Sequence, residues 1–119
     1  VEDDLELTLS LSLNLKALNG ILVFDEITTV KVMDLLRSKG FLIPKDISVI
    51  GFTNGELSRY ASPPVTMISQ HGRFIGETSA NKLIDRIEGK DDKAKFETKT
   101  IKTSLVVRQS TLSMEQQNS

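Results

Sequence analysis

The sequence contains no cysteine and no tryptophan, and it has only one histidine, one tyrosine and three prolines in 119 residues. Without cysteine, the chain can form neither a disulfide nor a thiolate metal site. With His71 as the single histidine, nucleophile–histidine pairs and histidine-rich metal sites are poorly supported. We therefore expect His71 to be a surface or capping residue, and we expect no cofactor.

Long hydrophobic runs and strong charge of either sign are also missing. No apolar run approaches the roughly 18 residues that a membrane span requires, and the amino end has no signal-peptide pattern. The net charge is −1 and no basic cluster stands out, so this chain is not itself expected to bind nucleic acid. With 39% hydrophobic residues, the composition predicts one globular domain with an aliphatic core.

Enzyme motifs are absent as well. There is no Gly-x-Ser-x-Gly element for a hydrolase and no glycine pattern that would cradle a phosphate. The carboxylates lie on predicted solvent-exposed faces or in loops, and no pair is required to act as acid and base. We therefore do not expect an enzyme. A small α/β enzyme, such as a hydrolase, stays open as an alternative.

What the sequence does have is a series of short apolar runs between turn signals. Residues 47–52 and 20–24 read as buried strands, and 65–68 is β-branched enough for another. Between the first two, a helix is predicted over 26–39, with Asp25 as its N-cap and Gly40 as its stop. Strand 20–24, helix 26–39 and strand 47–52 make a βαβ unit, which predicts a parallel sheet.

The carboxyl-terminal part is more varied. Residues 72–88 give the clearest helix, ended by Gly89. Residues 96–101 alternate between apolar and polar, 104–108 is expected to be a last short strand, and 111–119 a flexible tail. One apolar stripe of the helix is formed by Gly76, Ala80, Leu83, Ile84 and Ile87.

Residues 1–18 carry two conflicting signals. Leucines alternate with polar residues from Leu5 to Leu15, which favours a half-buried strand. Leucine is nevertheless a good helix former, and the acidic residues at 2–4 and 6 suit a helix start. The residues alone leave both structures open.

Three segments, in order and with sensible gaps, resemble the LacI/GalR family of bacterial transcription regulators: IPKDISVIGF, SPPVTMISQ and SLVVRQS. The resemblance covers roughly residues 19–110 and implies the carboxyl-terminal part of an effector domain that is similar to periplasmic sugar-binding proteins. It implies an α/β fold with a parallel-sheet lobe, part of a two-lobe domain. Residues 1–110 would belong to this domain, 71–90 to its other lobe, and 1–18 would hold a crossover helix.

Ligands of open parallel sheets collect beyond the carboxyl ends of the strands. Two such ends are followed by polar residues, namely Asp25-Glu26 and Thr53-Asn54. In the family, Asn-Asp usually follows the first strand and the Asp binds effector hydroxyls, so Glu26 keeps the carboxylate with one more methylene. By resemblance, Gln70 would lie near the cleft.

Each of these residues also has a purely structural interpretation. Asp25 could serve only as the helix cap, and Glu26 only as a partner of the helix dipole. Gln70 could be a polar residue at a strand end. Asn54-Gly55 fits a type I′ hairpin turn, although residues 56–62 do not make a convincing return strand.

The resemblance implies a cytoplasmic homodimer that senses a small effector, a sugar or sugar-like molecule. Operator DNA would be bound only through an amino-terminal helix-turn-helix domain that this sequence does not contain. The chain begins at Val1 rather than Met, as a fragment of a longer protein would. The alternative is a sugar-binding protein of a transport system, which would share the fold.

Overall fold

The computed structural model describes residues 2–14, 18–90, 95–113 and 115. In chain order it forms α1 (Glu2–Asn14), β1 (Gly20–Val23), α2 (Glu26–Ser38), β2 (Ser48–Phe52), α3 (Leu57–Tyr60), β3 (Thr66–Ser69), α4 (Gly72–Ile87) and β4 (Ser104–Val106). The α/β class is confirmed. The conflict at the amino end is resolved in favour of the helix, and α1 contacts the core through the buried side chain of Leu9.

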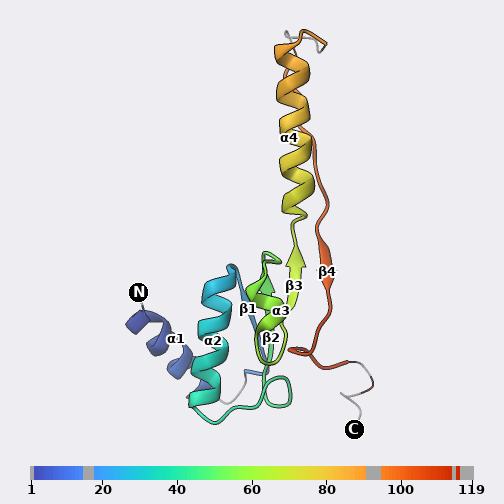
Figure 1. The fold of residues 1–119 in the computed structure, drawn as a ribbon. Helices are drawn as coiled ribbons and strands as arrows, with labels where there is room; N and C mark the ends of the chain where they lie inside the picture. The colour runs from blue at the N-terminus through green and yellow to red at the C-terminus, as the bar shows by residue number, and fades with distance from the viewer. Residues whose placement is uncertain (1, 15–17, 91–94, 114, 116–119) are drawn as a thin grey trace.

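The strands form one sheet in the order β1-β2-β3-β4 (Figure 1). β1 and β2 are parallel, with Leu22 opposite Ile50, and β2 and β3 are also parallel. β4 returns antiparallel to β3, with Leu105 opposite Ile68. The predicted βαβ unit is confirmed, with α2 as the crossover helix. Because β1, β2 and β3 run in the same direction, their carboxyl ends lie at one edge of the sheet.

The core lies between α2 and the sheet. Met33 and Leu36 of α2 are fully buried together with Val49 and Met67 of β2 and β3. Gly40 ends α2 with a φ of +86°, a left-handed conformation that glycine adopts at low cost. Ile27, in the first turn of α2, is 63% exposed, so not every apolar residue of this helix belongs to the core.

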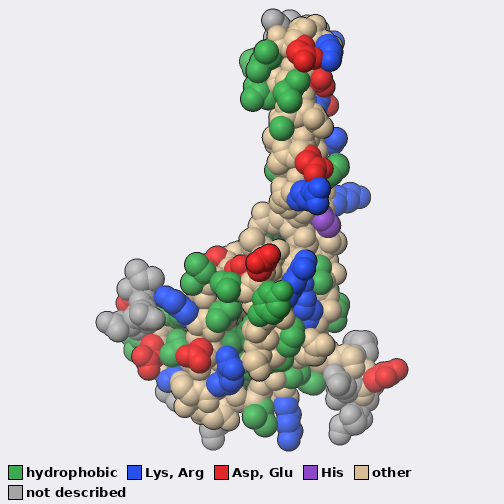
Figure 2. Space-filling view, viewed as in Figure 1, with side chains coloured by type: hydrophobic (Ala, Val, Ile, Leu, Met, Phe, Trp, Pro, Cys, Tyr) green, Lys and Arg blue, Asp and Glu red, His purple; other side chains and the backbone are tan. Residues whose placement is uncertain are grey.

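Beyond β3 the chain leaves this layered part and forms an arm (Figure 1). α4 rises from β3, and residues 95–103 run back along it to β4. The molecule is therefore elongated, with extents of 59 × 36 × 24 Å. No side chain of α4 is buried, so its predicted apolar stripe is exposed. Hydrophobic side chains gather on one side of the upper arm in Figure 2 and charged ones on the other.

The alternating stretch 96–101 does not form a strand, and Phe96 is 93% exposed. β4 ends at Val106 rather than at residue 108. The N–H of Arg108 donates to Thr66 Oγ1 at 2.9 Å, so the side chain of Thr66 replaces the backbone ladder at this point. Among the parts of the chain that the structure describes, no helix is both long and apolar enough to cross a membrane.

Candidate functional site at the carboxyl edge of the parallel strands

Polar side chains follow the three parallel strands at their shared edge. Asp25 lies two residues after β1, Thr53 follows β2 directly, and Gln70 follows β3. Nε2 of Gln70 donates to Oγ1 of Thr53 at 3.3 Å, which joins the ends of β2 and β3. The strand ends that the sequence singled out therefore lie at one edge of the sheet, and the contacts below show what each side chain does there.

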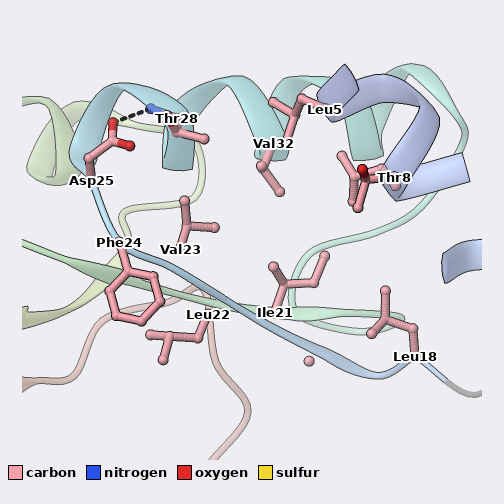
Figure 3. A pocket seen from close by; sticks show the side chains of 12 residues that line it. Leu5, Thr8, Leu18, Ile21, Leu22, Val23, Phe24, Asp25, Thr28 and Val32 are labelled. Carbon is pink, nitrogen blue, oxygen red and sulfur yellow. Dashed lines mark hydrogen bonds between the residues drawn. The ribbon is translucent and has the colours of Figure 1, made fainter. Parts of the chain in front are cut away.

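Asp25 is the N-cap of α2. Its Oδ1 accepts a hydrogen bond from the backbone N–H of Thr28 at 2.8 Å (Figure 3). Hydrogen bonds from Thr28, first from its side chain and then from its backbone, hold the pKa of the Asp25 carboxyl below its ordinary value. The predicted cap is confirmed. The side chain is exposed and ionised at neutral pH, so a carboxylate can cap this helix and still accept hydrogen bonds from a ligand.

Glu26 has a role that the sequence did not reveal. Its Oε1 accepts a hydrogen bond from the backbone N–H of Ser58 at 2.8 Å, which links the first turn of α2 to α3. Gly55 lies so close to this carboxylate that a Cβ there would clash with both oxygens. Glu26 is thus held against the loop that follows β2, and one of its oxygens is already engaged by the protein.

Asn54 is engaged by an arginine that follows β4. Oδ1 of Asn54 accepts a hydrogen bond from Nη2 of Arg108 at 2.8 Å. Arg108 Nη1 donates to the backbone oxygen of Val65 at 2.8 Å. Arg108 was missed as a site residue because it lies 54 residues from Asn54 in the sequence. The only available signal was its place within the SLVVRQS segment.

The turn after β2 differs from the type I′ turn that Asn54-Gly55 suggested. That turn requires positive φ at both of its central residues. In the structure neither Asn54 nor Gly55 has a positive φ, whereas Thr53 has a φ of +82°. This conformation is costly for a β-branched residue. The chain then enters the short helix α3, which sequence reasoning did not predict, instead of a hairpin.

A separate cavity of about 360 Å³ lies between α1, β1 and α2 (Figure 3). Its lining is mostly aliphatic, with Ile21 and Val23 of β1 facing Leu5 and Val32 of the two helices. The polar groups of Asp25 and Thr28 lie at one end of it. Such a lining offers few hydrogen bonds to a polar ligand, so the cavity is a weaker candidate site than the strand edge.

His71 lies at the base of the arm, as the exposed N-cap of α4 with a left-handed φ of 55°. Its Nε2 is 3.0 Å from Oγ of Ser104, so the two segments that connect the arm to the sheet meet here. The expectation of a surface or capping position is confirmed. No group of three or more potential metal ligands occurs among the described residues.

The parallel sheet with its crossover helix defines a class, namely the open α/β folds, in which ligands generally bind beyond the carboxyl ends of the strands. Residues 3–111 match the family described as the periplasmic binding protein-like domain, and the chain belongs to this family. Its relatives place it more narrowly among the effector domains of LacI-type regulators, which confirms the resemblance seen in the sequence.

Two of the relatives are transcriptional repressors named PurR. That of Aliivibrio fischeri strain MJ11 is 43% identical over 68 residues, which is 57% of this chain and 20% of the relative. That of Vibrio vulnificus is 40% identical over 90 residues, which is 75% of this chain and 26% of the relative. The chain thus spans only about a fifth to a quarter of the length of these curated relatives.

The similar solved structures are also LacI-type regulators. A LacI-type transcription regulator from Bifidobacterium animalis has a TM-score of 0.81 at 26% identity, covering 94% of this chain and 40% of that one. The lac repressor dimer bound to operator and the anti-inducer ONPF has a TM-score of 0.72 at 30% identity. The match covers 85% of this chain and 35% of the repressor chain.

Proposed function

We propose that the chain is part of the effector-sensing domain of a LacI-type transcriptional regulator and that it binds a small sugar-like molecule at the carboxyl edge of β1–β3. The observation that carries this proposal is the convergence of polar groups from three consecutive parallel strands at one edge. Asp25, Asn54 and Gln70 would contact the effector. Glu26 would contribute its remaining oxygen, since its other oxygen is bonded to Ser58.

Sugar recognition suits this chemistry. The Asp25 carboxylate accepts hydrogen bonds from hydroxyls, whereas the amides of Asn54 and Gln70 can both donate and accept. The exposed ring of Phe24 lies 6.0 Å from that of Phe52 at the same ends of β1 and β2, and it adds an apolar surface beside the polar groups. A similar solved structure, with a TM-score of 0.65 at 26% identity over 77% of this chain and 28% of that one, is the regulator CelR in complex with cellobiose.

The wider role follows from the relatives. Operator DNA would be bound by a helix-turn-helix domain outside this sequence, in a cytoplasmic homodimer that has no catalytic activity. An effector would change DNA binding only to the extent that its affinities for the two arrangements of the lobes differ. The names of the relatives, all transcriptional regulators, support this function over the alternative of a transport binding protein.

The test is a titration of the isotope-labelled chain with neutral sugars (cellobiose, lactose, D-galactose and D-ribose), followed by amide chemical shifts. We expect one of them to shift residues at the strand edge. Asp25→Ser keeps a good helix cap but removes the carboxylate, so it should weaken binding by at least about tenfold, the scale of one hydrogen bond to a charged group.

Glu56→Ala is the matched control, because Glu56 is an exposed carboxylate on the neighbouring loop. It should leave the affinity unchanged. The proposal fails if no sugar shifts the edge, or if Asp25→Ser and Gln70→Ala both bind as the unaltered chain does.

A further inference from the structure

Arg108 connects four separate parts of the molecule at the candidate site. It lies two residues after β4, on the segment that returns from the arm. Its guanidinium donates to Asn54 Oδ1 after β2 and to the backbone oxygen of Val65 before β3, both at 2.8 Å. A longer bond of 3.4 Å reaches Oγ of Ser58 in α3. This side chain is therefore fixed in three directions.

The backbone around Arg108 is fixed as well. Its N–H donates to Oγ1 of Thr66 at 2.9 Å. Two residues later, the fully buried Ser110 donates to the backbone oxygen of Val49 and accepts from the N–H of Thr66. The guanidinium thus projects from a backbone that is itself fixed by hydrogen bonds. It can therefore hold the Asn54 side chain in one orientation.

This contact determines which end of the Asn54 amide faces the guanidinium. Arginine has five N–H donors and no acceptor, so the Asn54 atom that faces it must be the carbonyl oxygen. The amide nitrogen of Asn54 then has no hydrogen-bond partner among the residues that the structure describes. Asn54 therefore has two unengaged N–H donors for a ligand, while its carbonyl oxygen already accepts from Arg108 with one of its two lone pairs.

We propose that Arg108 is a positioning residue that holds Asn54 with its N–H donors available, so that an acceptor of the effector is recognised at the end of β2. In a sugar, this acceptor would be a ring, glycosidic or carbonyl oxygen. Asp25 sets the opposite requirement at the end of β1, because an ionised carboxylate only accepts. The inference rests on the proposed function and adds the orientation of the effector. Donors of the effector would lie near Asp25, and an acceptor would lie near Asn54.

The first measurement needs no ligand. In the labelled chain, Arg108→Gln should shift the side-chain amide resonances of Asn54 and speed their exchange with water, since the carbonyl loses its charged donor. Arg59→Gln is the matched control, because it removes the same charge from an exposed position in α3. Asn54 resonances that are the same in the unaltered chain and in both variants would overturn the proposal.

The second measurement uses the same panel of neutral sugars and the variant Asn54→Asp. This variant keeps a partner for Arg108 and strengthens the contact by charge, so the melting temperature should be equal or higher. It nevertheless replaces the donor with an acceptor, and affinity should fall at least about tenfold. If the Asn54 amide does not donate to the sugar, this stable variant should bind as the unaltered chain does, and the proposal is wrong.

The two proposals fail in different ways. If Asn54 is held by Arg108 but no sugar binds, the proposed sugar site is wrong, and the requirement for an acceptor is overturned with it. If a sugar binds at the edge but Asn54→Asp binds it equally well, the sugar site stands and the role of Arg108 is wrong. If a sugar binds, and Asn54→Asp and Arg108→Gln weaken its binding whereas the control Arg59→Gln does not, both are supported.

Discussion

The carboxylate of Glu26 accepts a hydrogen bond from the backbone N–H of Ser58, 32 residues further along the chain, at 2.8 Å. This contact joins α2 to α3 and holds the loop between β2 and β3 from one side, while Arg108 holds it from the other. A residue expected to bind effector is therefore also part of the framework that shapes the site.

Glu26→Ala should lower the free energy of unfolding by about 1–2 kcal/mol, the scale for losing a partly exposed hydrogen bond to a charged acceptor. Urea denaturation of the chain would measure the change. Glu56→Ala removes an exposed carboxylate from the same loop and should change stability by less than about 0.5 kcal/mol. Equal effects of the two substitutions would show that the bond to Ser58 contributes nothing.

Gly55→Ala should destabilise the chain through the same contact, because its Cβ would displace the Glu26 carboxylate. The carboxylate is the end of a flexible side chain and can move, so we expect the loss to be that of its bond to Ser58, about 1–2 kcal/mol. In the background of Glu26→Ala the clash is removed, so the loss should be much smaller, and a double-mutant cycle would measure the difference. Gly76→Ala is the contrast: it lies mid-helix in open space and should stabilise by up to about 1 kcal/mol. Purely additive effects of Gly55→Ala and Glu26→Ala would refute the contact.

The elements that were predicted correctly are those whose signals are local. The N-cap at Asp25 and the stop at Gly40 define α2 without reference to the rest of the fold. The run from Ile47 to Phe52 is too short and too apolar to be a typical helix. These patterns, together with the rule that a crossover helix connects parallel strands, led to the parallel sheet and to its carboxyl edge.

The parts that were missed depend on contacts between residues distant in the sequence. Nothing near Glu26 indicates that its carboxylate would bond to Ser58, and nothing near Asn54 indicates Arg108. The alternation at 96–101 has the period of a strand, but within the described part of the chain no strand pairs with it, and Phe96 stays in solvent. Period alone cannot show whether a pairing partner exists.

Asp25 should give the chain a pH-dependent stability. Because the folded pKa is lowered by Thr28, the ionised carboxylate stabilises the fold above the unfolded pKa of about 3.9, and this contribution is lost as the pH falls through the folded pKa. Asp25→Asn keeps an uncharged cap. Its melting temperature should lie below that of the unaltered chain at about pH 7 and approach it at about pH 3. A difference that stays constant over this range would argue against the charged cap.

Ser110 should be one of the most sensitive positions near the carboxyl end. Its buried hydroxyl donates to the oxygen of Val49 at 2.5 Å and accepts from the N–H of Thr66 at 2.8 Å. Ser110→Ala leaves both backbone groups buried without this partner, and should cost about 2–3 kcal/mol in urea denaturation. Ser62→Ala, at an exposed position, is the control. A loss below about 0.5 kcal/mol would mean that water replaces the hydroxyl.

The exposed stripe of α4 should make this chain associate with itself. Lys82 pairs with Glu97, and Arg86 lies over the ring of Phe96, so the returning segment covers only one side of the helix. Leu83, Ile84 and Ile87 remain in solvent on the helix, with the small residues Gly76 and Ala80 in the same stripe. Apolar patches of this kind favour association.

Light scattering at increasing protein concentration should therefore show species larger than a monomer. Ile84→Lys places a charge within the stripe and should shift the distribution toward monomer, whereas Asn81→Lys adds the same charge to the polar face and should not. The comparison isolates the apolar surface, because the two variants have the same net charge. A monomeric unaltered chain at high concentration, or an equal response to both lysines, would show that the stripe does not drive association.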